Sequence, residues 1–250
     1  MKVYLADANS QMFRIAAQSI TPNGYPLRVL GSYWYFKDFW ADFWPPIAEF
    51  DPDIFADSGA FTADSQGVII NLAEYSEWLS GCKHKLFHYL NLDVLGNNEA
   101  TQEHQRQLEA LGHNPLPVFT LDRTEIRFDL LDEMCDKYPL ICLGNLVSLS
   151  GSVNKLMPYL IKCFRIAQGR TVFHGLGLMT WGVQKRLPFY SADSSGWGSG
   201  YRYGNVAVFD KTRPRTVKQS LIVVDLRAKL ASLLFDKFAV FYNSQNRTDA

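Results

Sequence analysis

The chain has 250 residues, 47% of them hydrophobic and 20% charged, a composition that supports a sizeable core and argues against disorder. Its formal net charge of +0 argues against a protein that coats nucleic acid non-specifically. No apolar run approaches the ~20 residues of a membrane span, and an acidic residue interrupts the N-terminus, MKVYLADANS, where a signal peptide would be apolar. The sequence therefore predicts a soluble, cytoplasmic protein.

Short apolar runs alternate with amphipathic stretches along the chain. Nine runs are candidate strands, at 3–6, 28–33, 53–56, 86–92, 116–120, 140–143, 171–173, 188–192 and 206–209. Their length and lack of strict alternation are typical of parallel strands buried on both faces. Helical spacing is found between them at 72–81, 99–111, 125–138 and 153–167, and Gly112 is positioned to end the second of these helices.

Strand–helix repetition of this kind predicts an α/β fold, either an open doubly wound sheet or a closed barrel. No G-x-G-x-x-G follows the first strand, which weakens the dinucleotide-binding version. We therefore expect a (β/α)8 TIM-type barrel forming a single domain over 1–242, with a loose tail at 243–250. Eight barrel positions for nine strands leave one strand peripheral.

Two further segments have helical patterns. Residues 216–241 are expected to form a long closing helix with Leu221, Val224 and Leu230 facing inward. The aromatic and acidic segment YWYFKDFWADFW, 33–44, is expected to be an amphipathic helix, although a lid or a dimer contact would have the same composition.

The four cysteines, Cys82, Cys135, Cys142 and Cys163, have no C-x-x-C spacing. This pattern predicts reduced thiols and no metal site. We expect neither a metal nor a redox cofactor.

Polar residues and glycines follow five of the candidate strands. They are Asp57-Ser58-Gly59, Asp93, Gly144-Asn145, His174-Gly175 and Asp193. In a β/α barrel these positions converge on the C-terminal rim, where active sites are built. Each has a structural explanation alone, since an aspartate before serine can cap a helix or shape a turn and a lone histidine is usually a satisfied core residue. Their joint placement predicts an enzyme.

Two aspartates on one rim fit a specific chemistry. A glycosidic carbon is substituted with retention when one carboxylate attacks it and a second protonates the leaving group. Asp57 and Asp193 supply the required residue types.

Five short motifs carry a family resemblance: VLGSYWYF at 29–36, ADSGAF at 56–61, GNL at 144–146, HGLG at 174–177 and SADSSGW at 191–197. Through them the chain resembles the tRNA-guanine transglycosylase superfamily. It is most similar to the compact DNA-guanine transglycosylases of 7-deazaguanine DNA modification (the DpdA group) of bacteria and phages. The resemblance implies that guanine in DNA is exchanged for a 7-deazaguanine such as preQ0.

The resemblance also implies residue roles. Asp193 would attack C1′ and hold the sugar covalently, while Asp57 would be the general acid/base. Asp93 would accept hydrogen bonds from the purine, with Phe61 and His174 on its two faces. The other substrate-binding residues that it implies are Gly144, Asn145, Gly175, Ser32 and Ser58.

The chain departs from the tRNA enzymes in three respects. No cysteine follows Cys163, so their C-terminal zinc site is missing, and this favours DNA over tRNA as the substrate. His174 stands where they have methionine. The region Val118-Phe119-Thr120 lacks their base-reading glutamine.

A locally basic segment follows the candidate site. Lys185, Arg186, Arg202, Arg213 and Arg215 would contact the nucleic-acid backbone, with Trp197, Tyr201 and Tyr203 interleaved, although a solvated surface explains such runs as often. A tRNA substrate, a barrel glycoside hydrolase and a non-catalytic nucleic-acid-binding barrel remain as alternatives.

Overall fold

The structure is a computed structural model that describes residues 1–6, 9–82, 86–122, 125–146, 149, 152–178, 180–198, 205–210 and 215–220. Contacts divide the chain into two compact units. Unit 1 comprises Met1–Ala6, Arg28–Trp40 and Asp53–Ser194, and unit 2 comprises Asp7–Leu27, Ala41–Pro52 and Ser195–Ala250. The expected tail at 243–250 lies outside the described residues.

Unit 1 contains an eight-stranded parallel sheet in the order β4-β3-β2-β1-β8-β7-β6-β5. Its strands are β1 (Lys2–Ala6), β2 (Arg28–Ser32), β3 (Asp53–Asp57), β4 (His88–Tyr89), β5 (Val118–Thr120), β6 (Leu140–Gly144), β7 (Val172–Gly175) and β8 (Ser191–Ser194). A parallel bridge between Leu90 and Leu116 joins the two ends of this order. It is supported by the Leu116 N–H, which donates to Tyr89 O at 2.8 Å, and the Asn91 N–H, which donates to Leu116 O at 2.9 Å. The bridge closes the strands into a ring, which confirms the predicted (β/α)8 fold.

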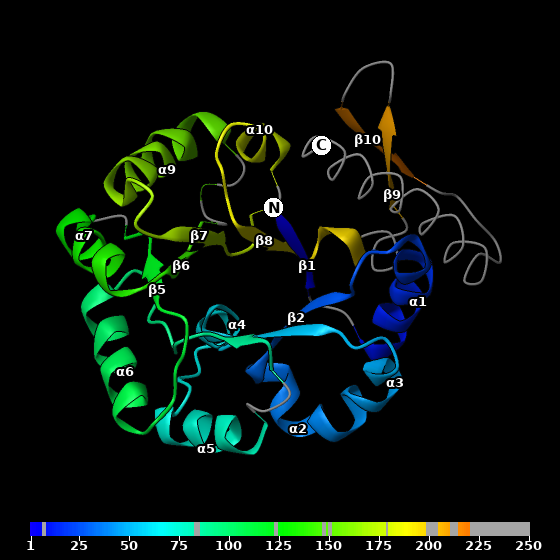
Figure 1. Cartoon of the computed structure of the whole chain (residues 1–250), viewed down its shortest axis with the longest axis horizontal. Helices are drawn as coiled ribbons and strands as arrows, with labels where there is room; N and C mark the ends of the chain where they lie inside the picture. The colour runs from blue at the N-terminus through cyan, green and yellow to red at the C-terminus, as the bar shows by residue number, and fades with distance from the viewer. Residues whose placement is uncertain are drawn as a thin grey trace. The chain divides into compact units, whose positions relative to one another are not determined.

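Helices surround this ring in Figure 1. They are α2 (Tyr33–Phe43), α5 (Leu72–Cys82), α6 (Asn98–Ala110), α7 (Phe128–Lys137), α9 (Val153–Ala167) and α10 (Trp181–Gln184). The four helices expected at 72–81, 99–111, 125–138 and 153–167 are confirmed as α5, α6, α7 and α9. Gly112, with φ of 81°, follows the last turn of α6 as expected. The helix expected at 33–44 is α2, which ends at Phe43.

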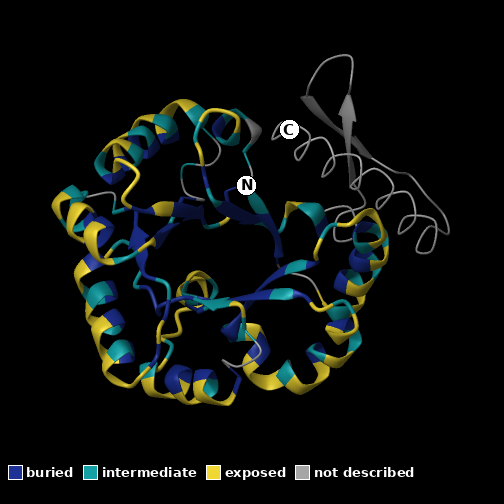
Figure 2. Ribbon diagram, in the orientation of Figure 1, coloured by how far each residue is buried: buried dark blue, intermediate teal, exposed yellow. Residues whose placement is uncertain are grey.

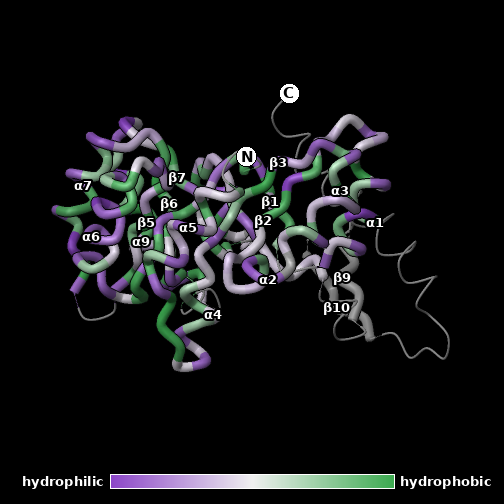
Figure 3. Tube along the Cα trace, turned by 90° about the horizontal axis from the view of Figure 1, so that it is seen from below, coloured by the Kyte–Doolittle hydropathy of each residue, from purple (hydrophilic) through white to green (hydrophobic). Residues whose placement is uncertain are grey.

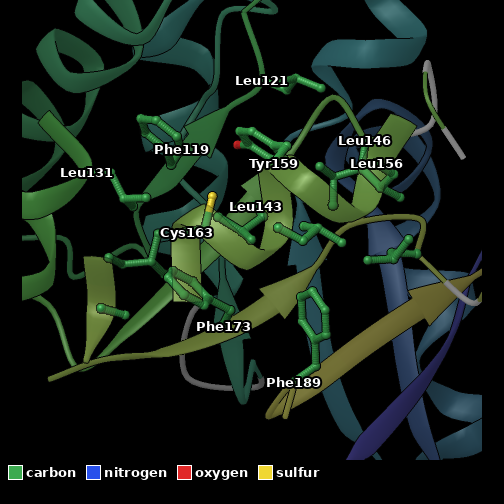
Figure 4. Packing of buried hydrophobic residues seen from close by; sticks show 14 of the residues in the cluster. Phe119, Leu121, Leu131, Leu143, Leu146, Leu156, Tyr159, Cys163, Phe173 and Phe189 are labelled. Atoms are coloured by element: carbon green, nitrogen blue, oxygen red, sulfur yellow. The ribbon is translucent and has the colours of Figure 1, made fainter. Parts of the chain in front are cut away.

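The strand register determines which side chains face the interior of the ring, because directly paired residues of parallel strands point to the same side. One interior cluster contains Tyr4, Ala6, Leu30, Phe55, Leu90, Val118 and Cys142. The alternate residues Ile141, Leu143 and Phe173 pack outward in a second cluster with side chains of α7 and α9 (Figure 4). Both faces of the strands are therefore buried, which explains their nearly continuous apolar runs (Figure 2).

Unit 2 contains α1 (Ser10–Ile20), η1 (Thr21–Asn23), α3 (Pro45–Ala48), η3 (Gly196–Gly198), β9 (Asn205–Asp210) and β10 (Arg215–Ser220). The ninth candidate strand, 206–209, is β9, which pairs antiparallel with β10 and so is the peripheral one.

The expectation of a helix over 216–241 is wrong at its start, because Arg215–Ser220 is a strand. Thr216 and Val217 are β-branched, and their segment pairs with β9 along its whole length. The remainder of the expected helix lies outside the described residues. No described helix has the length and apolar character needed to cross a membrane.

Candidate functional site at the C-terminal end of the barrel

Asp57 and Asp193 occupy equivalent places on their strands. Asp57 is the last residue of β3 and Asp193 is next to last in β8. Asp57 pairs with Ser32, and Asp193 pairs with the interior residue Tyr4. By this register both carboxylates point into the barrel near the ends of their strands, which is the rim expected from the sequence.

Three carboxylates act electrostatically on one buried thiol, that of Cys142. Cys142, on β6, is fully buried in the interior. Burial raises the pKa of its thiol well above the ordinary value, and the charges of Asp193, Asp57 and Asp93 raise this pKa further. The structure therefore brings all three aspartates within electrostatic range of one interior atom, although they come from three different strand ends.

Asp93 is 8% exposed and lies in the segment after β4. The Ser58 hydroxyl donates to its Oδ1 at 3.0 Å. Burial raises the pKa of the Asp93 carboxyl, while the Ser58 hydrogen bond opposes the shift. Ser58 thus links the Asp57 segment to Asp93 and is itself fully buried.

The turn after Asp57 is held close to the end of β2. Gly59 has φ of 79°, and an added Cβ would lie 2.2 Å from the Ser32 hydroxyl oxygen. The same hydroxyl accepts the Trp34 N–H at 3.2 Å. Only glycine fits this position, so the D-S-G motif is a packing requirement that fixes the chain at Asp57.

The short helix α4 (Ala60–Ser65) follows this turn. Figure 1 shows α4 within the ring of strands, and Figure 3 shows it at the end of the barrel opposite the chain start. Both views agree that α4 lies at the C-terminal end of the barrel. Phe61, on this helix, is 54% exposed, so a face of its ring is available to a ligand.

His174 differs in exposure from Phe61, its expected partner on the opposite purine face. It lies on β7 and is 0% exposed. Its Nδ1 is 2.8 Å from Ser191 Oγ and its Nε2 is 3.2 Å from Asp193 Oδ1. The structure therefore brings His174 to Asp193, with its ring enclosed.

Asp193 has a second hydrogen bond on the same oxygen. The Gly177 N–H donates to Asp193 Oδ1 at 2.8 Å. Asp193 Oδ2 has no hydrogen-bond partner within the described ranges of the chain. The two carboxylate oxygens therefore differ, because two groups hold Oδ1 and none of the described groups holds Oδ2.

Gly144 is the last residue of β6, and Asn145 follows it. The Gly144 carbonyl accepts the Leu121 N–H at 3.1 Å, and the Asn145 side chain donates to the Leu121 carbonyl at 2.7 Å. Asn145 has φ of 57°, a left-handed conformation that asparagine adopts more readily than most residues. The pair therefore has a structural role in joining β6 to the segment after β5. Gly175 ends β7, where an added Cβ would lie 3.0 Å from Leu178 Cδ2.

The basic residues are only partly described. Lys185 and Arg186 are exposed, between α10 and β8. Arg215 begins β10, and Trp197 lies in η3, where its ring contacts Phe13 within unit 2. Arg202, Arg213, Tyr201 and Tyr203 lie outside the described residues. No group of three or more His, Cys, Asp or Glu side chains that could hold a metal is found in the described part of the chain.

Two residues at this site, Ser191 and Gly177, had no predicted role. Both belong to motifs identified in the sequence, SADSSGW and HGLG. The signal for Ser191 was its spacing, because residues two apart on a strand face the same side, and Ser191 and Asp193 are two apart.

No family model and no curated protein matches the chain. Among solved structures, the chain is similar to one described as a fructose-1,6-biphosphate aldolase from Coccidioides immitis, with a TM-score of 0.56 and 8% sequence identity. The match covers 96% of this chain and 86% of the other. At this identity the likeness shows the barrel fold and nothing about the reaction.

Proposed function

We propose that this barrel is a base-exchanging transglycosylase that replaces guanine in DNA with a 7-deazaguanine. The observation that carries the proposal is the convergence of three strand-end carboxylates. Asp57 and Asp193 point into the barrel by their strand register, and Asp93 accepts a hydrogen bond from Ser58, the neighbour of Asp57. A nucleophile, a general acid and an acceptor for the base are the three carboxylate roles that such an exchange needs.

Asp193 would be the nucleophile. Its Oδ2 attacks C1′ of an extruded deoxyguanosine, the C1′–N bond breaks, and an aspartyl–sugar ester forms. Because Oδ1 is held by two groups, the attacking oxygen has a defined direction, and such orientation is a large part of the catalytic effect.

Asp57 would be the general acid and then the base. It gives its proton to the departing guanine, which takes the electron pair of the broken bond. The incoming 7-deazaguanine then loses its N9 proton to Asp57 and attacks C1′, so that the ester breaks and Asp193 is restored. Two inversions at C1′ give net retention.

Asp93 would read the base. An ionised carboxylate only accepts hydrogen bonds, which suits the adjacent N–H donors on a guanine edge. Phe61, exposed on α4, would stack on the extruded base, a contact worth about 1–3 kcal/mol.

The test is incorporation of radiolabelled guanine by the purified protein into duplex DNA or tRNA, with Asp193→Asn as the control. We expect label in DNA with the wild type and none with the variant. Label in tRNA alone would establish the tRNA substrate instead. Label in neither, together with hydrolysis of an aryl glycoside, would establish a glycoside hydrolase.

A further inference from the structure

His174 is enclosed in the barrel interior with both ring nitrogens engaged. Its ring lies edge-on to Phe55, with centroids 4.8 Å apart, and to Tyr4, at 5.9 Å. Ser191 Oγ approaches Nδ1 at 2.8 Å, and Asp193 Oδ1 approaches Nε2 at 3.2 Å. The two aromatic contacts fix the plane of the imidazole, and the two polar contacts fix its orientation within that plane.

The chemistry of the two partners determines the tautomer. A carboxylate has no hydrogen to donate, so the nitrogen that faces Asp193 must carry the hydrogen. In a neutral imidazole the other nitrogen is then an acceptor. The Ser191 hydroxyl can rotate to donate to it, and this hydrogen bond adds to the preference for the Nε2–H form that the carboxylate sets.

We infer that His174 is a positioning residue for Asp193 and that Ser191 holds it in the Nε2–H tautomer. His174 and the Gly177 N–H together hold Oδ1, which leaves Oδ2 directed at the sugar. This role rests on the proposed function, in which Asp193 is the nucleophile. It differs from the role that the family resemblance implies, in which the ring lies on a face of the purine.

Burial favours the positioning role. A ring that stacks on a base must expose a face when the base is absent, as Phe61 does at 54%, whereas His174 is 0% exposed. Ser191, 2% exposed, and Asp193, 5% exposed, are enclosed with it. Buried polar chains of this kind hold their members in one geometry.

Three substitutions of His174 separate the two roles. The amide nitrogen of glutamine reaches the place of Nε2, that of asparagine reaches only the place of Nδ1, and phenylalanine keeps an aromatic face. The measured quantity is the single-turnover rate constant for formation of the covalent protein–DNA adduct, together with the KM for 7-deazaguanine. Circular dichroism would verify that each variant is folded.

If His174 positions Asp193, His174→Gln keeps adduct formation within about 10-fold of wild type, while His174→Asn and His174→Phe lose about 10²-fold, the scale of a misplaced reacting group. The KM for the incoming base stays unchanged in all three. A near-wild-type rate in His174→Phe, or an equal loss in His174→Gln and His174→Phe, would overturn the inference.

A second measurement does not depend on base exchange. Nitrogen-15 NMR of the imidazole reports directly which ring nitrogen carries the hydrogen. We expect the Nε2–H form in the wild type. Asp193→Ala should shift it partly to the Nδ1–H form, because the carboxylate that requires the hydrogen on Nε2 is then missing and the Ser191 hydroxyl can accept from Nδ1. An Nδ1–H wild type would contradict the inference even if the enzyme exchanged bases. Conversely, a confirmed Nε2–H form in a protein without exchange activity would leave the geometry intact and reject the proposed function.

Discussion

Gly59 and Ser32 lie so close that a methyl group on Gly59 would meet the Ser32 hydroxyl oxygen at 2.2 Å. Ser32 is also the register partner of Asp57. The contact therefore connects the shape of the turn after β3 to the position of one candidate catalytic carboxylate.

Gly59→Ala should be strongly destabilising for this reason. The substitution combines a left-handed φ of 79° with a steric clash, and we expect a loss of about 2–4 kcal/mol in unfolding free energy. Gly67→Ala is the matched control, because Gly67 has φ of 69° but no atom within 4 Å of an added Cβ, and it should cost about 1 kcal/mol. Urea unfolding measures both, and equal losses would show that the Ser32 contact has no energetic weight.

The fold could be predicted because its signals are local. Eight apolar runs correspond to β1–β8, and polar residues or glycines follow five of them. Closure of the ring was harder to foresee, since β4 is only two residues long and the ring is completed by one bridge, Leu90 to Leu116. The apolar run 86–92 predicts a strand, but hydrophobicity does not show which of its residues pair with a neighbouring strand.

The candidate site was predictable only in part. Asp57, Asp93 and Asp193 could be predicted because each follows an apolar run, and a β/α barrel brings such positions together at its C-terminal rim. The enclosure of His174 agrees with the explanation of a lone histidine as a core residue. Its contact with Asp193 was not predictable, because it depends on packing against Phe55 and Tyr4 from distant strands. Ser191 had no predicted role, although its spacing of two residues from Asp193 on one strand places both side chains on the same side.

The two aspartates proposed as nucleophile and general acid should differ in which substrate restores activity to their variants. Asp193→Asn should abolish adduct formation with every base, whereas Asp57→Asn should slow exchange of guanine by roughly 10²–10⁴-fold, the range for general acid catalysis. A 7-methylguanine in the DNA leaves as a neutral base without a proton, so it should restore most of the rate to Asp57→Asn alone. Quenched single-turnover assays measure this, with Asp64→Asn, exposed on α4, as the control. Rescue of both variants, or of neither, would contradict the assigned roles.

Asp93→Asn should separate stability from base recognition. Burial raises the pKa of Asp93, so the charged form weakens folding at neutral pH, and this cost disappears as the pH falls below the ordinary aspartate pKa of about 3.9. Asparagine keeps an oxygen for the Ser58 hydroxyl and removes the charge. The unfolding free energy at neutral pH should therefore equal or exceed that of wild type by about 0.5–2 kcal/mol, with the difference shrinking on acidification.

The same variant should lose exchange activity, because its amide presents a donor to the purine N–H groups. In the wild type, activity should fall as the pH drops through the raised pKa of Asp93, at a higher pH than for an exposed aspartate. Denaturant titrations and exchange assays across weakly acidic to neutral pH measure both effects. A clear loss of stability in Asp93→Asn would show that the carboxylate has a structural role instead.

Replacing Lys185 and Arg186 tests whether the protein binds nucleic acid at this site. Both residues are exposed and precede β8, the strand of Asp193. If they contact phosphates, replacing both with glutamine should weaken DNA binding equally for all sequences and reduce the slope of log Kd against log salt by about 2. Arg106→Gln with Lys137→Gln is the matched control. It removes the same charge, but from residues whose charges are offset by Glu103 and Glu109. Fluorescence anisotropy over a salt series measures these slopes. An equal change of slope in the two double variants would mean that net charge determines binding and that Lys185 and Arg186 make no specific contact.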